Sequence, residues 1–223
     1  MYRMKPKLVL LGMLAEDVNN WHRDDPSTHV WACQGFYAKT NVIPDMIWDI
    51  HKSMPIARDG VEYALWPMMY NVYNRPVMTH PDATHFYYLN PTLRLKYPQS
   101  LIAEFGGPDN FTSTVSYMLA YAVRLGYTRI ELVGIRMDDA ADHLQELAGL
   151  VDLIDHIRNA QRTPAVGVRG VMPNVRISCK YETLWRELYP TLPRPDPRTW
   201  PRGLPYGDIV DIWKGDERVA GGK

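Results

Sequence analysis

The chain has 223 residues, of which 46% are hydrophobic and 22% are charged, an ordinary balance for a globular domain with a sizeable core. Lysine plus arginine number 25 and aspartate plus glutamate number 25, so the totals show no strongly basic nucleic-acid footprint, although arginines gather between residues 158 and 176. Cys33 and Cys179 lie in apolar surroundings, which indicates a reducing compartment rather than a disulfide framework. The apolar run 8–11 is too short for a signal-peptide core or a membrane span, so we expect no membrane contact and a cytoplasmic location, in the host cytoplasm if the source is viral.

Short apolar or aromatic runs in the first half of the chain predict buried strands. These runs are 8–11, 28–33, 46–51 and 85–91. The first ends at Gly12, and the last closes on Asn90-Pro91, a pair that stops a strand. The loop after Gly12 lacks a Gly-x-Gly-x-x-Gly pattern, which argues against an NAD or FAD enzyme.

Residues 111–135 carry the clearest pattern in the chain. Apolar residues recur at helical spacing over 115–123, with Thr112 or Ser113 placed to cap the helix and a glycine just past its end. The apolar run 130–135 then predicts a strand that is covered on both faces.

The second half of the chain continues the alternation of helix and strand. Helix-like spacing covers 138–160, a strand is indicated over 175–179, and a short helix over 181–189. We therefore predict one α/β domain over 1–189, a Rossmann-like, doubly wound and mainly parallel sheet. Repeated prolines predict an extended tail over 190–223.

In a parallel sheet the residues at the strand ends meet at one edge, where open α/β folds bind ligands. The polar candidates at these ends are Gly12, Gln34, Asp49, His51, Asn90, Asp138 and Asp139. The hydroxyl-rich start of the 115–123 helix, formed by Thr112, Ser113 and Thr114, joins them. A helix start of this kind can seat a phosphate, although capping alone is the commoner role of such residues.

His51 is the candidate general base, because a histidine with a pKa near neutrality can take a proton from an attacking hydroxyl. Asp49 lies two residues earlier on the same side of the strand, where it can pair with His51, orient it or act as base itself. Asp138 and Asp139 are the candidate ligands if a divalent cation is bound, but Asp139 is better explained as a helix cap. No His-Glu-x-x-His, Walker, Gly-x-Ser-x-Gly or kinase motif occurs.

Three segments resemble bacterial sialyltransferases of the Campylobacter lipooligosaccharide type. Residues 30–37 are similar to the family's Cys-Asn-Gln-Phe-Tyr segment, 88–91 to its Tyr-Asn-Pro, and 112–135 to its Thr-Ser-Gly helix and following strand. The same helix–strand unit occurs in a broader set of uncharacterised proteins, many of them from bacteriophages.

The resemblance implies a Rossmann-like glycosyltransferase domain that binds a nucleotide-sugar without an obligatory metal. It implies that Thr112, Ser113, Asn90 and, with a change of type, Gln34 contact the nucleotide. The family's catalytic histidine, in its C-terminal half, has no recognisable match in this chain.

Three departures from the family pattern fall at the expected nucleotide site. The segment from Gly12 to Ala15 lacks the family's Gly-Asn-Gly-Pro-Ser loop, and Thr114 replaces a glycine. Arg136 stands where an aspartate usually follows Gly-Ile, and an arginine there can neutralise a phosphate.

We therefore predict a glycosyltransferase that moves a sugar from a nucleotide-sugar to a hydroxyl acceptor, with His51 or Asp49 as base. A hydroxylated base in bacteriophage DNA is one candidate acceptor, against which the zero net charge argues mildly. The alternatives are a nucleotide-dependent phosphotransferase or pyrophosphokinase, and a protein that sequesters a nucleotide without chemistry. The sequence predicts no oligomeric state.

Overall fold

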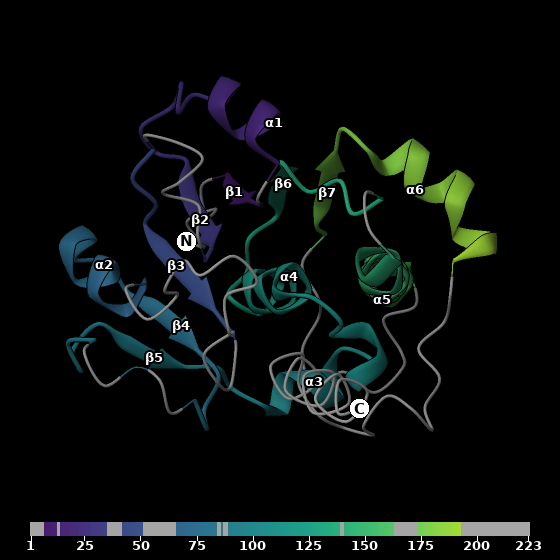
Figure 1. Ribbon diagram of the computed structural model, residues 1–223. Helices are drawn as coiled ribbons and strands as arrows, with labels where there is room; N and C mark the ends of the chain where they lie inside the picture. Colours follow the sequence, from purple (N-terminus) through teal and green to yellow (C-terminus); the bar gives the residue numbers. More distant parts are fainter. Residues whose placement is uncertain are drawn as a thin grey trace, which may run out of the picture.

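A computed structural model describes residues 7–12, 14–34, 42–50, 66–83, 86, 89–138, 141–162 and 174–192. Its centre is a seven-stranded sheet in the order β5-β4-β3-β2-β1-β6-β7 (Figure 1). The strands are β1 (Leu8–Leu11), β2 (His29–Cys33), β3 (Met46–Asp49), β4 (Val77–Thr79), β5 (Arg94–Lys96), β6 (Arg129–Val133) and β7 (Arg176–Cys179). Every neighbouring pair is parallel, so the predicted doubly wound, Rossmann-like α/β fold is confirmed.

Helices cover the sheet from two sides (Figure 1). They are α1 (Ala15–Asn20), α2 (Trp66–Tyr73), α3 (Ser100–Glu104), α4 (Thr114–Arg124), α5 (Ala141–Arg162) and α6 (Glu182–Leu188), with short 3₁₀ turns at Pro108–Asn110 and Tyr189–Thr191. None of these helices is both long and apolar enough to cross a bilayer, a finding that concerns the described residues alone.

Alternate residues of each strand feed two separate cores, as the two-residue period of a strand requires. Leu10 and Trp48 belong to the core that includes α4 and α5, whereas Leu11 and Ile47 belong to the core that includes Tyr70 of α2. We call these two sides of the sheet the α4 face and the α2 face. Trp21, which follows α1, packs on the α2 face.

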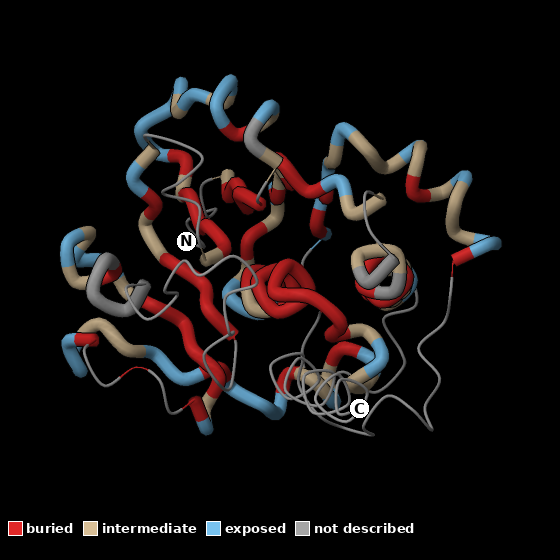
Figure 2. Tube along the Cα trace, viewed as in Figure 1, coloured by how far each residue is buried: buried red, intermediate tan, exposed pale blue. Residues whose placement is uncertain are grey.

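α4 is the most deeply buried helix of the structure and confirms the pattern predicted over 115–123. Its residues from Thr114 to Ala120 are all buried, and Figure 2 shows the helix as an almost continuous red coil. Tyr117 lies edge-on to Tyr97 and Phe111, with ring centroids 5.0 Å apart in both pairs. This packing fixes α4 across the carboxyl half of the sheet, where Cys33 Sγ lies 3.5 Å from Met118 Sδ.

The strand predicted over 85–91 is wrong at the residues described there. Leu89 N–H donates to the Phe86 carbonyl and Leu93 N–H to that of Asn90, so the chain turns at this point. The Asn90 carboxamide oxygen accepts from the Thr92 N–H at 3.1 Å, an Asx turn that competes with strand pairing. The adjoining strands β4 and β5 have only three residues each, too few to show a period.

The predicted tail over 190–223 lies almost wholly outside the described residues. Its first three residues close the last 3₁₀ turn, and Leu192 is buried in the core of the α4 face. The boundary at residue 189 therefore stays a prediction.

Candidate functional site

The chain changes direction across the sheet between β1 and β6. Leu11 and Val133 are register partners at the carboxyl ends of these strands. β1 leads into α1 and Trp21 on the α2 face, whereas β6 leads into α5 on the α4 face. The two connections leave the strand ends toward opposite faces, and this is the position where open α/β sheets bind ligands. We call this position the switch point.

Two glycines form the floor of the switch point. The Gly12 N–H donates to the Val133 carbonyl at 2.8 Å, and the Leu14 N–H to the Gly134 carbonyl at 3.0 Å. A Cβ at Gly12 would lie 2.4 Å from the Gly134 carbonyl oxygen. This close packing of the two turns is sufficient to explain why the position is glycine. The predicted nucleotide contact of Gly12 stays a prediction, at the sheet edge where it was expected.

Arg136 lies three residues beyond the end of β6, beside the switch point, on its rim, and its contact with a phosphate stays a prediction. Its side chain is 47% exposed and pairs with Asp138, with Nε 2.5 Å from Oδ1. Its guanidinium carbon lies 5.9 Å from the centre of the Tyr181 ring, and the Trp185 indole donates to its backbone carbonyl at 2.7 Å. The backbone is therefore held firmly while the charged end remains accessible to solvent.

Lys180 brings a second cation to the same rim from the end of β7. Its Nζ lies 5.1 Å from the Tyr181 ring centre and donates to Asp17 Oδ1 at 2.7 Å. Burial opposes ionisation of Asp17, but the hydrogen bonds from Lys180 and Tyr181 outweigh it and lower the pKa of Asp17. The same hydrogen bond raises the pKa of Lys180, so both groups are charged throughout the neutral range.

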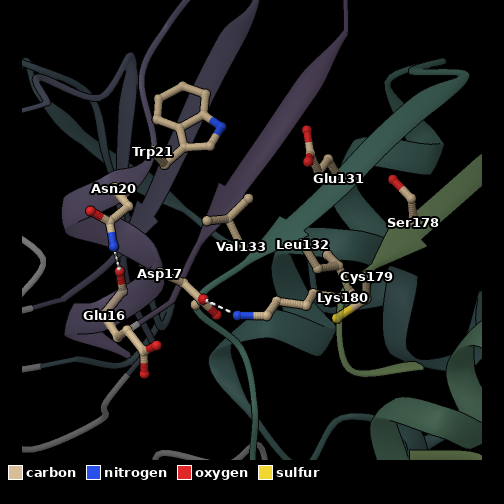
Figure 3. Close-up of a pocket in the computed structure, with 11 residues that line it drawn as sticks. Glu16, Asp17, Asn20, Trp21, Glu131, Leu132, Val133, Ser178, Cys179 and Lys180 are labelled. Carbon is tan, nitrogen blue, oxygen red and sulfur yellow. Dashed lines mark hydrogen bonds and ion pairs between the residues drawn. The ribbon is translucent and has the colours of Figure 1, made fainter. Parts of the chain in front are cut away.

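A pocket of about 490 Å³ adjoins the switch point on the α2 face (Figure 3). Its lining comprises Glu16, Asp17, Asn20, Trp21, Glu131, Leu132, Val133, Gly134, Ser178, Cys179 and Lys180. In Figure 3 the side chains of α1 and Trp21 lie across from those of β6 and β7, and the Asp17–Lys180 ion pair spans the gap. We call this the α1–β6–β7 pocket.

The predicted phosphate seat at the start of α4 is occupied by the protein's own contacts. Ser113 caps the helix and accepts from the Ser116 N–H at 3.4 Å, which confirms the capping role. The Thr112 hydroxyl donates to the Glu146 carbonyl of α5 at 2.7 Å, and Thr112, Ser113 and Thr114 are all buried. Contact of these three residues with a nucleotide stays a prediction.

Asp49 and the start of α4 lie on opposite faces of the sheet. Asp49 is 2% exposed and accepts from the Tyr70 hydroxyl of α2 at 3.0 Å. It therefore faces α2, whereas Thr112 is bound to α5 on the α4 face. His51, the candidate base, lies outside the described residues.

Gln34 and Asn90 lie at opposite edges of the sheet, Gln34 at the carboxyl edge and Asn90 at the amino edge. Gln34 directly follows β2, and its N–H donates to the Trp48 carbonyl at 2.8 Å, so it stands at the carboxyl edge as predicted. The expectation that Asn90 joins this edge is wrong, because it precedes β5 near the point where β4 begins at Val77. The cause is the misassigned strand, which placed Asn90 at a strand end rather than before a strand start.

The carboxylate pair considered for a metal is only partly described. Asp138 is ion-paired with Arg136, and Asp139 lies outside the described residues. Within the described ranges no group of three or more His, Cys, Asp or Glu side chains is arranged to hold a metal ion.

Three residues at this edge were missed by sequence reasoning: Asp17, Lys180 and Tyr181. A signal for two of them was present, since the strand predicted over 175–179 puts the residues that follow it at the carboxyl edge. Asp17 carried no such signal, because its position depends on the short helix α1 turning it toward β7.

No family model matches the chain, and no curated protein matches it. The structure is similar to that of the sialyltransferase CstII from Campylobacter jejuni, solved in complex with a substrate analogue, CMP-3FNeuAc. The two share 15% sequence identity with a TM-score of 0.45, over 78% of this chain and 80% of that chain. We assign no residue a role from this likeness.

Proposed function

We propose that this protein transfers a sugar from a nucleotide-sugar donor to a hydroxyl acceptor, with the donor phosphate at the switch point. The observation that carries the proposal is the pair of accessible cations, Arg136 and Lys180, beside the glycine turns at Gly12 and Gly134. The two cations supply charge complementarity to a phosphate at the switch point, where open α/β sheets bind ligands. The sequence resemblance over 112–135 points to the same chemistry.

In the proposed reaction the bond between the anomeric carbon and the phosphate oxygen breaks, and its electron pair leaves with the nucleotide. The acceptor oxygen bonds to the anomeric carbon and gives its proton to a base. Arg136 and Lys180 stabilise the negative charge that grows on the departing phosphate, which is the role that a metal ion has in other transferases. For this reason no obligatory metal is part of the proposal.

His51 is the proposed base, and Asp49 is proposed to position it. Asp49 is buried and hydrogen-bonded to Tyr70, so it is poorly placed to exchange protons with a substrate. A buried carboxylate that is fixed by a tyrosine is well suited to orient a neighbouring group.

The acceptor that we propose is a hydroxylated base in bacteriophage DNA, and a saccharide is the other candidate. A DNA acceptor requires phosphate contacts, and their number sets a steep dependence of binding on salt. Transfer of label from the donor into DNA, compared with transfer to saccharides, separates these acceptors.

Ligand-induced stabilisation tests the donor. We expect a CMP-, UDP- or GDP-sugar to raise the melting temperature. At a concentration 100 times its Kd, the ligand should add about 2.7 kcal/mol to the free energy of unfolding. Arg136→Met should weaken the effect about tenfold or more. Arg176→Met is the matched control, because Arg176 is an exposed cation at the opposite, amino end of β7.

Each alternative gives a distinct result. Stabilisation by ATP with no sugar nucleotide effective would select the phosphotransferase, and no stabilisation by any nucleotide would reject the proposal. His51→Asn should abolish turnover while the donor still binds, whereas a sequestering protein has no turnover to lose.

A further inference from the structure

The α1–β6–β7 pocket is separate from the rim that carries Arg136. It opens on the α2 face, where Glu131 and Val133 of β6 are half-buried and Ser178 of β7 is exposed. Its volume of about 490 Å³ falls within the range of small-molecule sites.

The lining combines one aromatic ring with several hydrogen-bonding groups. Trp21 provides a flat apolar surface, and Figure 3 shows it above Val133 with Glu131 across from it. Glu16, Asp17, Asn20, Glu131 and Ser178 also line the pocket, and the Asn20 amide donates to the Glu16 carbonyl of its own helix at 2.7 Å. Such a wall matches a sugar, whose C–H groups pack on an aromatic ring while its hydroxyls donate to carboxylates.

The charge balance of the pocket disfavours a phosphate. Its lining includes three acidic residues, Glu16, Asp17 and Glu131, against a single cation, Lys180. Glu131 is ion-paired with Lys7, which does not line the pocket. A neutral, hydroxyl-rich ligand therefore fits the pocket better than an anionic one.

The pocket is also placed next to the proposed donor position. Gly134 and Lys180 belong to both its wall and the switch point, and Arg136 follows Gly134 by two residues. A ligand in the pocket would thus lie beside the donor phosphate.

We infer that the α1–β6–β7 pocket binds a neutral saccharide that stacks on Trp21 and is the part of the acceptor remote from its reacting hydroxyl, since His51 follows β3, three strands from β6. This inference rests on the proposed function. The ligand class follows from the lining: one ring, three carboxylates, an amide and a hydroxyl within one cavity.

An array of neutral, sialylated and phosphorylated saccharides, probed with labelled full-length protein, tests the inference. Wild type should bind neutral saccharides, and Trp21→Ala should weaken that binding about tenfold or more. Because Trp21 also packs on the core of the α2 face, a second variant is needed. Ser178→Arg places a long side chain in the pocket from an exposed position, and Ser178→Ala is its matched control, expected to bind like wild type.

The inference is overturned if no neutral saccharide binds, if only sialylated or phosphorylated ones bind, or if Ser178→Arg binds as well as wild type. Thermal shift with nucleotide-sugars on the same variants separates this failure from failure of the proposed function. Donor stabilisation without saccharide binding rejects the pocket alone. If saccharide binding is lost in Ser178→Arg but no nucleotide-sugar stabilises the protein, the inference about the pocket stands and the proposed transferase function is rejected.

Discussion

The start of α4 and the switch point both have the sequence features of a phosphate site, but their polar groups are used differently. At the start of α4, Thr112 is bonded to Glu146 of the next helix and Ser113 to its own helix. At the switch point, the Arg136 and Lys180 side chains are 47% and 63% exposed and remain within reach of a solute. The hydroxyl-rich helix start is therefore a structural joint in this fold, whereas the cationic rim, though ion-paired with Asp138 and Asp17, is where we propose that the donor phosphate binds.

The largest effect is expected from Gly12→Ala, which breaks the floor of the switch point. The new Cβ would lie 2.4 Å from the Gly134 carbonyl oxygen and 2.6 Å from Ile135 Cγ1, so backbone must move. We expect a loss of roughly 2–4 kcal/mol in the free energy of unfolding, measured by urea denaturation. Gly126→Ala is the control: its φ of +85° is strained but its Cβ meets nothing within 4 Å, so about 1 kcal/mol should be lost. Equal losses in the two variants would show that the floor is not tightly packed.

A smaller effect is expected from Thr112→Val, which tests whether the start of α4 is a joint. The variant keeps the shape of the side chain but removes the hydroxyl that donates to the Glu146 carbonyl at 2.7 Å, a bond additional to the helical one of α5. We expect a loss of about 1–3 kcal/mol in the absence of any ligand, measured in the same way.

Thr191→Val is the matched control for this change. It removes a hydroxyl-to-carbonyl bond of 2.8 Å at an exposed site, where water replaces the lost donor, so the change should stay within about 0.5 kcal/mol. If Thr112→Val is as stable as the wild type but binds the donor more weakly, the start of α4 is a ligand site and not a structural joint.

Much of the fold could be predicted because its longer elements carry a clear period. The apolar runs of β1 and β2 follow from burial on both faces of the sheet, and the helical spacing over 115–123 follows from burial against the sheet. The strand predicted over 85–91 is wrong at the residues described there, because aromatic composition without alternation is a weak strand signal and Asn90 forms an Asx turn instead. The true strands on either side are too short to show alternation.

The site was predictable only where it follows from strand order along the chain. Gly12, Gln34 and Arg136 could be placed because each directly follows a predicted strand end or lies close behind one. Asp17 could not be placed, since its partner Lys180 is far away in sequence and the two meet only when β7 joins β6. The hydrogen bond from the Thr112 hydroxyl to the Glu146 carbonyl could not be predicted either, because it depends on how α5 packs against the turn before α4.

At neutral pH the smallest effect on stability is expected from the two thiols, Cys33 beside Met118 of α4 and Cys179 at the end of β7. Burial, aided by the negative charges of Glu146 and Asp49, raises the pKa of Cys33 to about 12. Burial likewise raises the pKa of Cys179 to about 12, although the Tyr181 N–H opposes the rise. Because folding favours the neutral thiols, their contribution to stability is complete below pH 9 and is lost as the pH rises toward 12.

At pH 8 both thiols should therefore react with iodoacetamide on the order of 10³ times more slowly in the folded chain than in urea, as followed by mass spectrometry of each cysteine peptide. Ligands sharpen the comparison between the regions. A nucleotide-sugar at the switch point should slow labelling of Cys179, whose Sγ lies 3.8 Å from the Ile135 carbonyl oxygen, and leave Cys33 beneath α4 unchanged. Labelling of Cys33 at the rate found in urea would instead mean that the α4 side opens readily, because its thiol is reached only by separating β2 from α4.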